Sequence, residues 1–268
     1  MSYEKYLRKM YSNIKLDIED LYLLESYQIG YLPDRVPPRE FVSVLWAYPS
    51  LKRFFISKNP EIETFINNLI KKHEPATSPK ELAEHGDKLV WEIADMIIYC
   101  KHPEALDKIA TLTWSFTEII SVVDLKNKIV VDAGAGTGRL AFKASETAKV
   151  VYAVEPNTSL RQFIREKAAK TKTSNLFTID GFLHAIPFPN ESVDVLITSR
   201  AFGWHLEKEL HEIERVVKKG GFAIHLSGYP FDEDNPVHSV VTSPNWKYQH
   251  SRYKENTGWK SKYWKKIE

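Results

Sequence analysis

Three glycines at alternate positions, Gly134, Gly136 and Gly138, follow a short apolar segment and precede a helix-forming one. The β-branched run at 129–131 predicts a buried strand, and the carboxylate of Asp132 closes it. A glycine-rich turn between a strand and a helix can bring backbone N–H groups against a ligand, because glycine adopts positive φ and has no Cβ. The stretch therefore predicts a cofactor pocket.

The spacing of the glycines indicates which cofactor the pocket takes. The dinucleotide fingerprint is G-x-G-x-x-G, and its third glycine would fall at position 139, which is Arg. This departure disfavours an NAD-type reductase. A glycine-rich loop that binds nothing is the simpler alternative, and the acid behind a buried strand weighs against it.

Two further acidic residues lie where predicted strands end. Glu155 ends the strand at 150–155, and Asp180 follows the strand at 175–179. A carboxylate at the end of the second strand can accept hydrogen bonds from both hydroxyls of a ribose, and one at the end of the third can accept from an exocyclic amine. A solvated strand end and a simple Asp-Gly turn are the respective alternatives.

The order of these segments resembles the class I methyltransferases that use S-adenosylmethionine (SAM), in particular the type 11-like small-molecule family. Asp132 and G-x-G-x-G match the first family motif, and Ile186-Pro187-Phe188 resembles the segment before the fourth strand. Lys218-Lys219-Gly220-Gly221 resembles the turn before the fifth strand, with Lys219 in place of the usual proline. The resemblance covers residues 105–229 well and the C-terminal hairpin loosely. It implies SAM as cofactor and S-adenosylhomocysteine (SAH) as product.

The resemblance also implies roles for individual residues. The glycine turn and Asp132 would hold the methionine end of SAM, Glu155 the ribose, and Asp180 the adenine amine, with Phe182 or Leu183 over the adenine ring. The full set implied for cofactor binding is Asp132, Ala133, Gly134, Gly136, Gly138, Glu155, Pro156, Asp180, Gly181, Phe182 and Ser199.

The segment 199–205, after the fourth strand, is where this family contacts cofactor and substrate. It lacks the Asn/Asp-Pro-Pro-aromatic run of enzymes acting on adenine or amide nitrogens, and Cys100 lies too far upstream to act as a cytosine C5 nucleophile. His205 is the candidate general base, because a neutral imidazole can accept a proton near pH 7. A helix-flanking histidine without a catalytic role is the alternative. His184 and His225 rank lower, and His225 has the position of a core histidine.

Methyl transfer from a sulfonium requires mainly that donor and acceptor be held in line. The acceptor atom, oxygen, nitrogen or carbon, is therefore left open by the sequence.

Strand–helix alternation from residue 128 predicts an α/β fold, a Rossmann-like doubly wound sheet of five parallel strands plus a C-terminal antiparallel hairpin. The residues before 126 carry apolar positions three and four apart, which predicts helices. The sequence thus divides into an N-terminal helical cap, 1–125, and a SAM-binding domain, 126–268. The expected strands are 129–132, 150–155, 175–179, 193–198 and 222–226, with hairpin strands at 246–253 and 258–267 joined by a turn at 255–257.

Composition limits the remaining function classes. The chain has 268 residues, is 43% hydrophobic and carries a net charge of +2, which gives no general reason to expect a nucleic-acid or membrane partner. A single cysteine excludes an internal disulfide framework and a zinc site of known spacing, so no metal is expected. The sequence shows no signal-peptide core and no run of about 18 apolar residues. We therefore expect a cytoplasmic protein with a small-molecule substrate, and the oligomeric state is left open.

Two other functions are compatible with the motifs. A SAM-binding scaffold or sensor without transfer activity would carry the same cofactor residues. An RNA methyltransferase would use the C-terminal hairpin, where seven Lys and Arg stand against two Glu over 246–268, interleaved with Trp and Tyr. The simpler explanation of the hairpin is a sheet edge whose aromatic residues pack inward and whose lysines discourage strand pairing.

Overall fold

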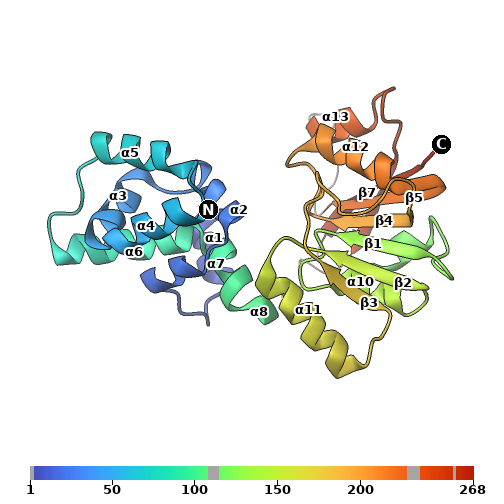
Figure 1. The fold of residues 1–268 in the computed structure, drawn as a ribbon, viewed down its shortest axis with the longest axis horizontal. Helices are drawn as coiled ribbons and strands as arrows, with labels where there is room; N and C mark the ends of the chain where they lie inside the picture. Colours follow the sequence, from blue (N-terminus) through green and yellow to red (C-terminus); the bar gives the residue numbers. More distant parts are fainter. Residues whose placement is uncertain (1–2, 108–114, 228–235, 256–257) are drawn as a thin grey trace. The chain divides into compact units, whose positions relative to one another are not determined.

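The computed structural model describes residues 3–107, 115–227, 236–255 and 258–268. Packing divides the chain into two compact units, Met1–Ala105 and Leu106–Glu268 (Figure 1). The sequence placed this boundary at 125. It falls earlier because Ile119 and Leu125 are fully buried in the core of the second unit.

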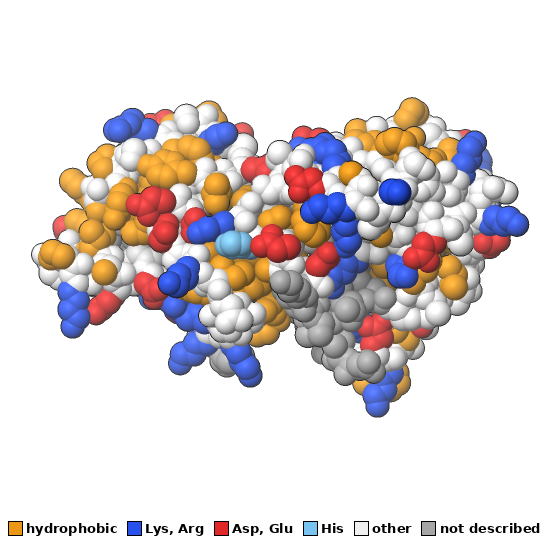
Figure 2. Space-filling model, turned by 90° about the horizontal axis from the view of Figure 1, so that it is seen from below, with side chains coloured by type: hydrophobic (Ala, Val, Ile, Leu, Met, Phe, Trp, Pro, Cys, Tyr) orange, Lys and Arg blue, Asp and Glu red, His pale blue; other side chains and the backbone are white. Residues whose placement is uncertain are grey.

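The first unit is helical, as the apolar spacing predicts. Its core includes the fully buried side chains of Phe41, Phe55 and Ile97. Figure 2 shows apolar patches and charged side chains intermixed on the face of this unit that is turned to the viewer. Its helices are α1 (Tyr3–Met10), η1 (Ile18–Leu23), α2 (Ser26–Gly30), η2 (Leu32–Asp34), α3 (Pro38–Ala47), α4 (Pro49–Lys58), α5 (Ile62–Lys72), α6 (Pro79–Glu92) and α7 (Ala94–Lys101), and α8 (Pro103–Asp107) crosses the boundary.

The second unit contains one seven-stranded sheet, in the order β3-β2-β1-β4-β5-β7-β6. The first five strands are parallel, and β7 pairs antiparallel with both β5 and β6, which confirms the predicted sheet and hairpin. The strands are β1 (Ile129–Ala133), β2 (Val150–Val154), β3 (Leu176–Ile179), β4 (Val193–Ser199), β5 (Val217–Ser227), β6 (Gln249–Glu255) and β7 (Gly258–Lys266).

Helices cover both faces of this sheet, because alternate strand residues point to opposite sides. On one face, α10 (Arg139–Ser145) and α11 (Thr158–Thr171) pack against Val130, Val151 and Ile197. On the other, α12 (Leu206–Val216) packs against Val131 and Leu196. Two shorter helices, α9 (Thr117–Ile120) and α13 (Pro236–Val241), complete the unit. The result is the doubly wound arrangement that the strand–helix alternation predicts.

The turn before β5 differs from the prediction. The sequence predicts a turn at Lys218-Lys219-Gly220-Gly221 and a fifth strand at 222–226, but α12 ends at Val216 and β5 begins at the next residue. The N–H of Gly220 donates to the carbonyl of Ile267 at 2.7 Å, and the N–H of Ile267 donates to Gly221 at 2.9 Å. Bonds to the C-terminal segment therefore hold both glycines within β5, where Gly220 has a positive φ of +80°.

The hairpin strand β6 begins at Gln249, three residues after the predicted start at Trp246. Of its predicted turn, residues 256–257 lie outside the described part of the chain. Among the described residues, no helix is long and apolar enough to cross a membrane.

Candidate cofactor and active site

The glycine turn lies where the strand order reverses, because β1 is flanked by β2 on one side and β4 on the other. In open α/β sheets, ligands bind at this switch point, beyond the carboxyl ends of the strands. All three glycines have positive φ: +71° at Gly134, +56° at Gly136 and +79° at Gly138. A Cβ on Gly134 would overlap that of Ala201, whereas one on Gly136 would meet nothing within 4 Å. The turn thus packs tightly at its start and stays open in its middle, as a ligand cradle requires.

Asp132 lies beneath this turn and is almost completely buried. Its Oδ2 accepts the Ala141 N–H at 3.0 Å, while its Oδ1 has no hydrogen-bond partner. Burial raises the pKa of Asp132 to about 7, and the nearby charge of Glu155 adds to the rise. A buried acceptor without a donor is costly, so the site favours a ligand that brings a hydrogen-bond donor or a positive charge.

Glu155 follows β2 and is also buried. Its carboxylate accepts the N–H of Gly136 at 2.9 Å and the N–H of Asn157 at 3.0 Å. Both oxygens of a carboxylate can accept more than one hydrogen bond, which is compatible with contacts to ribose hydroxyls. Glu155 therefore shapes the glycine turn as well as facing the site, a role that the sequence did not suggest.

Asp180 lies at the end of β3 with 70% of its side chain exposed, and its Oδ1 accepts from Arg161 at 3.0 Å. Arg161 also donates to the carbonyls of Glu155 and Pro156, at 2.7 and 2.6 Å. It therefore joins the ends of β2 and β3. A Cβ on Gly181 would lie 2.7 Å from Pro187, so this position requires glycine for packing.

Arg161 was not predicted from the sequence, because no local pattern marks an arginine that binds carbonyls of a neighbouring turn. Asn157 was not predicted either, and its side chain accepts the Leu160 N–H at 3.1 Å and caps α11. An Asn directly before a helical segment is a known start signal and could have identified it.

The remaining predicted cofactor residues lie at the same edge of the sheet. Ala133 ends β1 and is fully buried, and Ser199 ends β4 beside Leu226 of β5. Phe182 follows Asp180, and its ring stacks on that of His184, with centroids 5.2 Å apart. The structure thus brings the predicted residues together at the carboxyl ends of β1 to β4.

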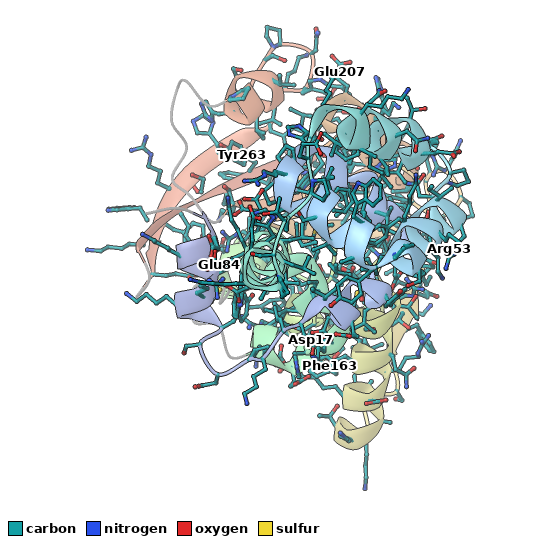
Figure 3. The ribbon with its side chains drawn as sticks, turned by 90° about the vertical axis from the view of Figure 1, so that its left-hand side faces the viewer. Asp17, Arg53, Glu84, Phe163, Glu207 and Tyr263 are labelled. Atoms are coloured by element: carbon teal, nitrogen blue, oxygen red, sulfur yellow. The ribbon has the colours of Figure 1, made fainter. Side chains whose placement is uncertain are left out.

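His205 immediately precedes α12, and its ring meets that of His184 edge-on at 4.6 Å between centroids. Glu209 fixes the backbone here, accepting the N–H of His205 at 2.8 Å and of Gly203 at 2.7 Å. Burial lowers the pKa of His184, and the adjacent His205 lowers it further. Glu207, which is labelled in Figure 3, lies two residues after His205 in the first turn of α12. His184, ranked low from the sequence, is therefore a direct neighbour of the candidate base.

His225 is a core residue, as its strand position suggested. It is buried between Thr198, whose hydroxyl lies 2.9 Å from its Nδ1, and Phe202, whose ring stacks on it at 4.1 Å. Burial lowers the pKa of His225 to about 3, so the ring is neutral at physiological pH.

The C-terminal hairpin uses several of its lysines in ion pairs. Lys260 and Lys262 are buried and pair with Glu255 at 2.6 Å and Glu118 at 2.9 Å, and Lys265 pairs with Glu214. Three of the seven basic residues are thus engaged with acids and do not form an open basic stripe. Tyr248, Tyr253 and Tyr263 of this segment are buried. These contacts favour the simpler explanation of the hairpin over RNA binding.

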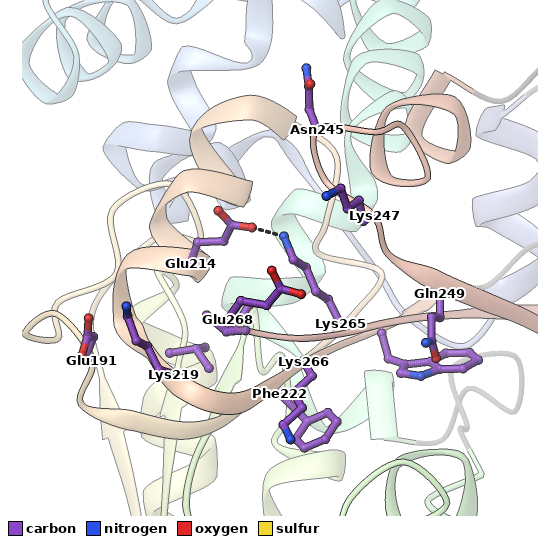
Figure 4. A pocket seen from close by; sticks show the side chains of 13 residues that line it. Glu191, Glu214, Lys219, Phe222, Asn245, Lys247, Gln249, Lys265, Lys266 and Glu268 are labelled. Carbon is purple, nitrogen blue, oxygen red and sulfur yellow. Dashed lines mark hydrogen bonds and ion pairs between the residues drawn. The ribbon is translucent and has the colours of Figure 1, made fainter.

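An open cavity of about 710 Å³ lies at the opposite end of β5, between α12 and the hairpin (Figure 4). Lys219, Phe222 and Trp264 are among the residues that line it, and the Glu214–Lys265 pair crosses it. Because β5 begins at this edge, the cavity is separate from the glycine turn. In the described part of the chain, no three His, Cys, Asp or Glu side chains are arranged to hold a metal ion.

Comparison with known proteins agrees with this geometry. Residues 131–225 match the family model described as a methyltransferase domain. Relatives include an uncharacterized methyltransferase of Anoxybacillus flavithermus, 31% identical over 109 residues, which are 39% of this chain and 49% of the relative. Another, from Geobacillus sp., is 29% identical over 111 residues, which are 40% of this chain and 50% of the relative. The chain thus spans about half the length of these curated relatives.

Among solved structures, a SAM-dependent methyltransferase from Aquifex aeolicus superimposes with a TM-score of 0.51 and 18% identity. The match covers 62% of this chain and 98% of that one. The second unit has the Rossmann-like fold of class I methyltransferases. Residues 131–225 match a methyltransferase domain, and this match together with the fold agrees with the resemblance found in the sequence.

Proposed function

We propose that this protein is a SAM-dependent methyltransferase that transfers a methyl group to oxygen, nitrogen or carbon of a small molecule. The observation that carries the proposal is the pairing of an open glycine turn with a buried acid beneath it. Gly136 presents no side chain to the site, and Asp132 Oδ1 has no donor. The family match over 131–225 supports this assignment.

The residues present fit SAM. The amino group of its methionine end would supply the donor and positive charge that Asp132 Oδ1 lacks. The carboxylate of Glu155 would accept the ribose hydroxyls. Asp180, whose exposed side chain is held by Arg161, would accept from the adenine amine, with Phe182 beside the ring.

When bound, SAM supplies a methyl carbon activated by sulfonium, so the acceptor lone pair forms the new bond while the carbon–sulfur electrons pass to sulfur, giving SAH. The protein then has to align the acceptor, exclude water and accept a proton where the acceptor carries one. We assign the last role to His205. Its imidazole is exposed at the carboxyl edge of the sheet, and the neighbouring His184 ring limits its orientation.

A His205→Gln variant tests this assignment. Because only the backbone of His205 takes part in the bonds to Glu209, the substitution leaves them in place. We expect kcat at pH 7 to fall by about a hundredfold, as for loss of a general base, while SAH affinity stays unchanged. His211→Gln, on the same helix with its ring against Trp246, is the matched control and should retain full activity.

The measurement is SAH formation from SAM with a panel of phenols, amines and carbon acids. Acceptor-dependent turnover, lost in His205→Gln and kept in His211→Gln, supports the proposal. Tight SAH binding without turnover on any acceptor class would instead favour a SAM-binding scaffold or sensor. Equal turnover by both variants would remove the proton-accepting role from His205.

A further inference from the structure

Asp107, the last residue of α8, lies within a cluster of donors around the glycine turn. Its carboxylate accepts from Lys167 of α11 at 2.7 Å and from Arg139 of α10 at 3.3 Å. It also accepts the hydroxyl of Thr137, which lies between Gly136 and Gly138. Burial alone would raise the pKa of Asp107, but these donors outweigh it and the pKa is lowered, so the group is ionised at neutral pH.

Arg139 adds a second bond to the same segment, since its guanidinium donates to the carbonyl of Leu106. Lys167, the other cation on Asp107, also lies over the ring of Phe142 in α10, 4.9 Å from its centroid. The start of α10 and the middle of α11 are therefore both tied to the end of α8. All of these residues belong to the second unit.

The rest of the turn is held from the sheet. Gly134 and Ala135 donate to the carbonyl of Val154 at 2.8 and 3.2 Å, and Gly136 donates to Glu155. The bonds from the sheet end at Gly136, and within the turn the N–H of Gly138 donates to the carbonyl of Ala135 at 2.8 Å. Beyond Gly136, Thr137 is buried and its side chain is bonded to Asp107. Because glycine has the largest backbone freedom to lose, a side-chain bond from the residue between two glycines adds to this backbone bond in ordering the turn before the ligand binds.

We propose that Asp107 is a positioning residue that pre-organises the second half of the glycine turn for the cofactor, acting through Thr137 and Arg139. This inference rests on the proposed function, because the cofactor is taken to be SAM. Arg139 stands where a dinucleotide-binding turn would have its third glycine. In this protein its side chain instead pairs with Asp107.

Asp107→Asn tests the proposal, with Glu146→Gln as control. Glu146 also pairs with a lysine of α10, Lys143, at 2.9 Å, but at the exposed far end of that helix. We expect the Kd for SAH to rise about tenfold in Asp107→Asn and to stay within twofold in Glu146→Gln. Thr137→Val should weaken binding as well, but by less than Asp107→Asn, because it removes the hydroxyl contact and leaves the pairs of Asp107 with Arg139 and Lys167.

Hydrogen exchange of peptides spanning 134–140 in the ligand-free protein distinguishes ordering of the glycine turn from a general effect on stability. Exchange there should be at least several-fold faster in Asp107→Asn and unchanged in Glu146→Gln. A variant with lowered thermal stability but wild-type exchange in 134–140 and wild-type SAH affinity would overturn the inference. If wild type binds no SAH, the proposed function fails, and the exchange comparison still decides whether Asp107 orders the turn.

Discussion

Replacing Gly136 with Ala is expected to weaken SAH binding strongly while leaving the protein folded. The added Cβ meets no atom of the protein within 4 Å, so it projects into the space assigned to the cofactor. The cost to folding is limited to the positive φ of +56°, about 1–2 kcal/mol for a residue with a Cβ. We therefore expect SAH affinity to fall at least about thirtyfold in calorimetry, with a drop of a few degrees in Tm.

Gly220→Ala is the matched control for this variant. Gly220 has φ +80° and an equally open Cβ position, but it lies near the start of β5, bonded to the C-terminal segment and away from the glycine turn. It should lose similar stability and bind SAH like wild type. Equal SAH affinity in the two variants would show that the open space above Gly136 is not where the cofactor lies.

Cofactor affinity should depend on pH through Asp132. With a folded-state pKa of about 7, the group is mostly protonated at pH 6 and mostly ionised at pH 7.5. Only the ionised form pairs with the amino group of the ligand, so SAH should bind roughly eightfold more weakly at pH 6 than at pH 7.5. Asp132→Asn should bind weakly at both values and lose this dependence.

The same shift predicts the pH dependence of stability without ligand. A carboxyl whose pKa is raised on folding stabilises the protein while protonated, and this contribution is lost as pH rises from the unfolded value near 3.9 to about 7. The Tm of Asp132→Asn should therefore rise relative to the Tm of wild type between pH 5 and pH 8. A constant difference in Tm over this range would show that Asp132 is already ionised at the lower pH.

The sheet could be predicted from the sequence because its signals are local. The apolar runs of β1, β2 and β4 are bounded by charged residues or turns, and the positions of Asp132 and Glu155 follow from the strand ends. Their assembly at one edge is a property of parallel strands and needs no further information.

Non-local contacts account for what the sequence did not reveal. Gly220 was expected in a turn before the fifth strand, yet it lies within β5 and its N–H donates to the carbonyl of Ile267 far along the chain. Arg161 joins two strand ends, and Asp107 reaches a turn thirty residues later, at Thr137. No periodicity or spacing marks such partners, because each depends on how separate elements pack. The residues that bind the methyl acceptor could not be predicted from the sequence for the same reason.

The measurement that tests the central claim most directly is calorimetric titration of the purified protein with SAM, SAH and NADH, in wild type and in Glu155→Gln. Gln keeps the size of the side chain but removes the charge and one acceptor oxygen, so both the ribose contact and the bond to Gly136 should weaken. We predict micromolar binding of SAM and SAH, none of NADH, and an affinity about tenfold lower for the variant. A preference for NADH, or binding of none of the three, would contradict the assignment of this site to SAM.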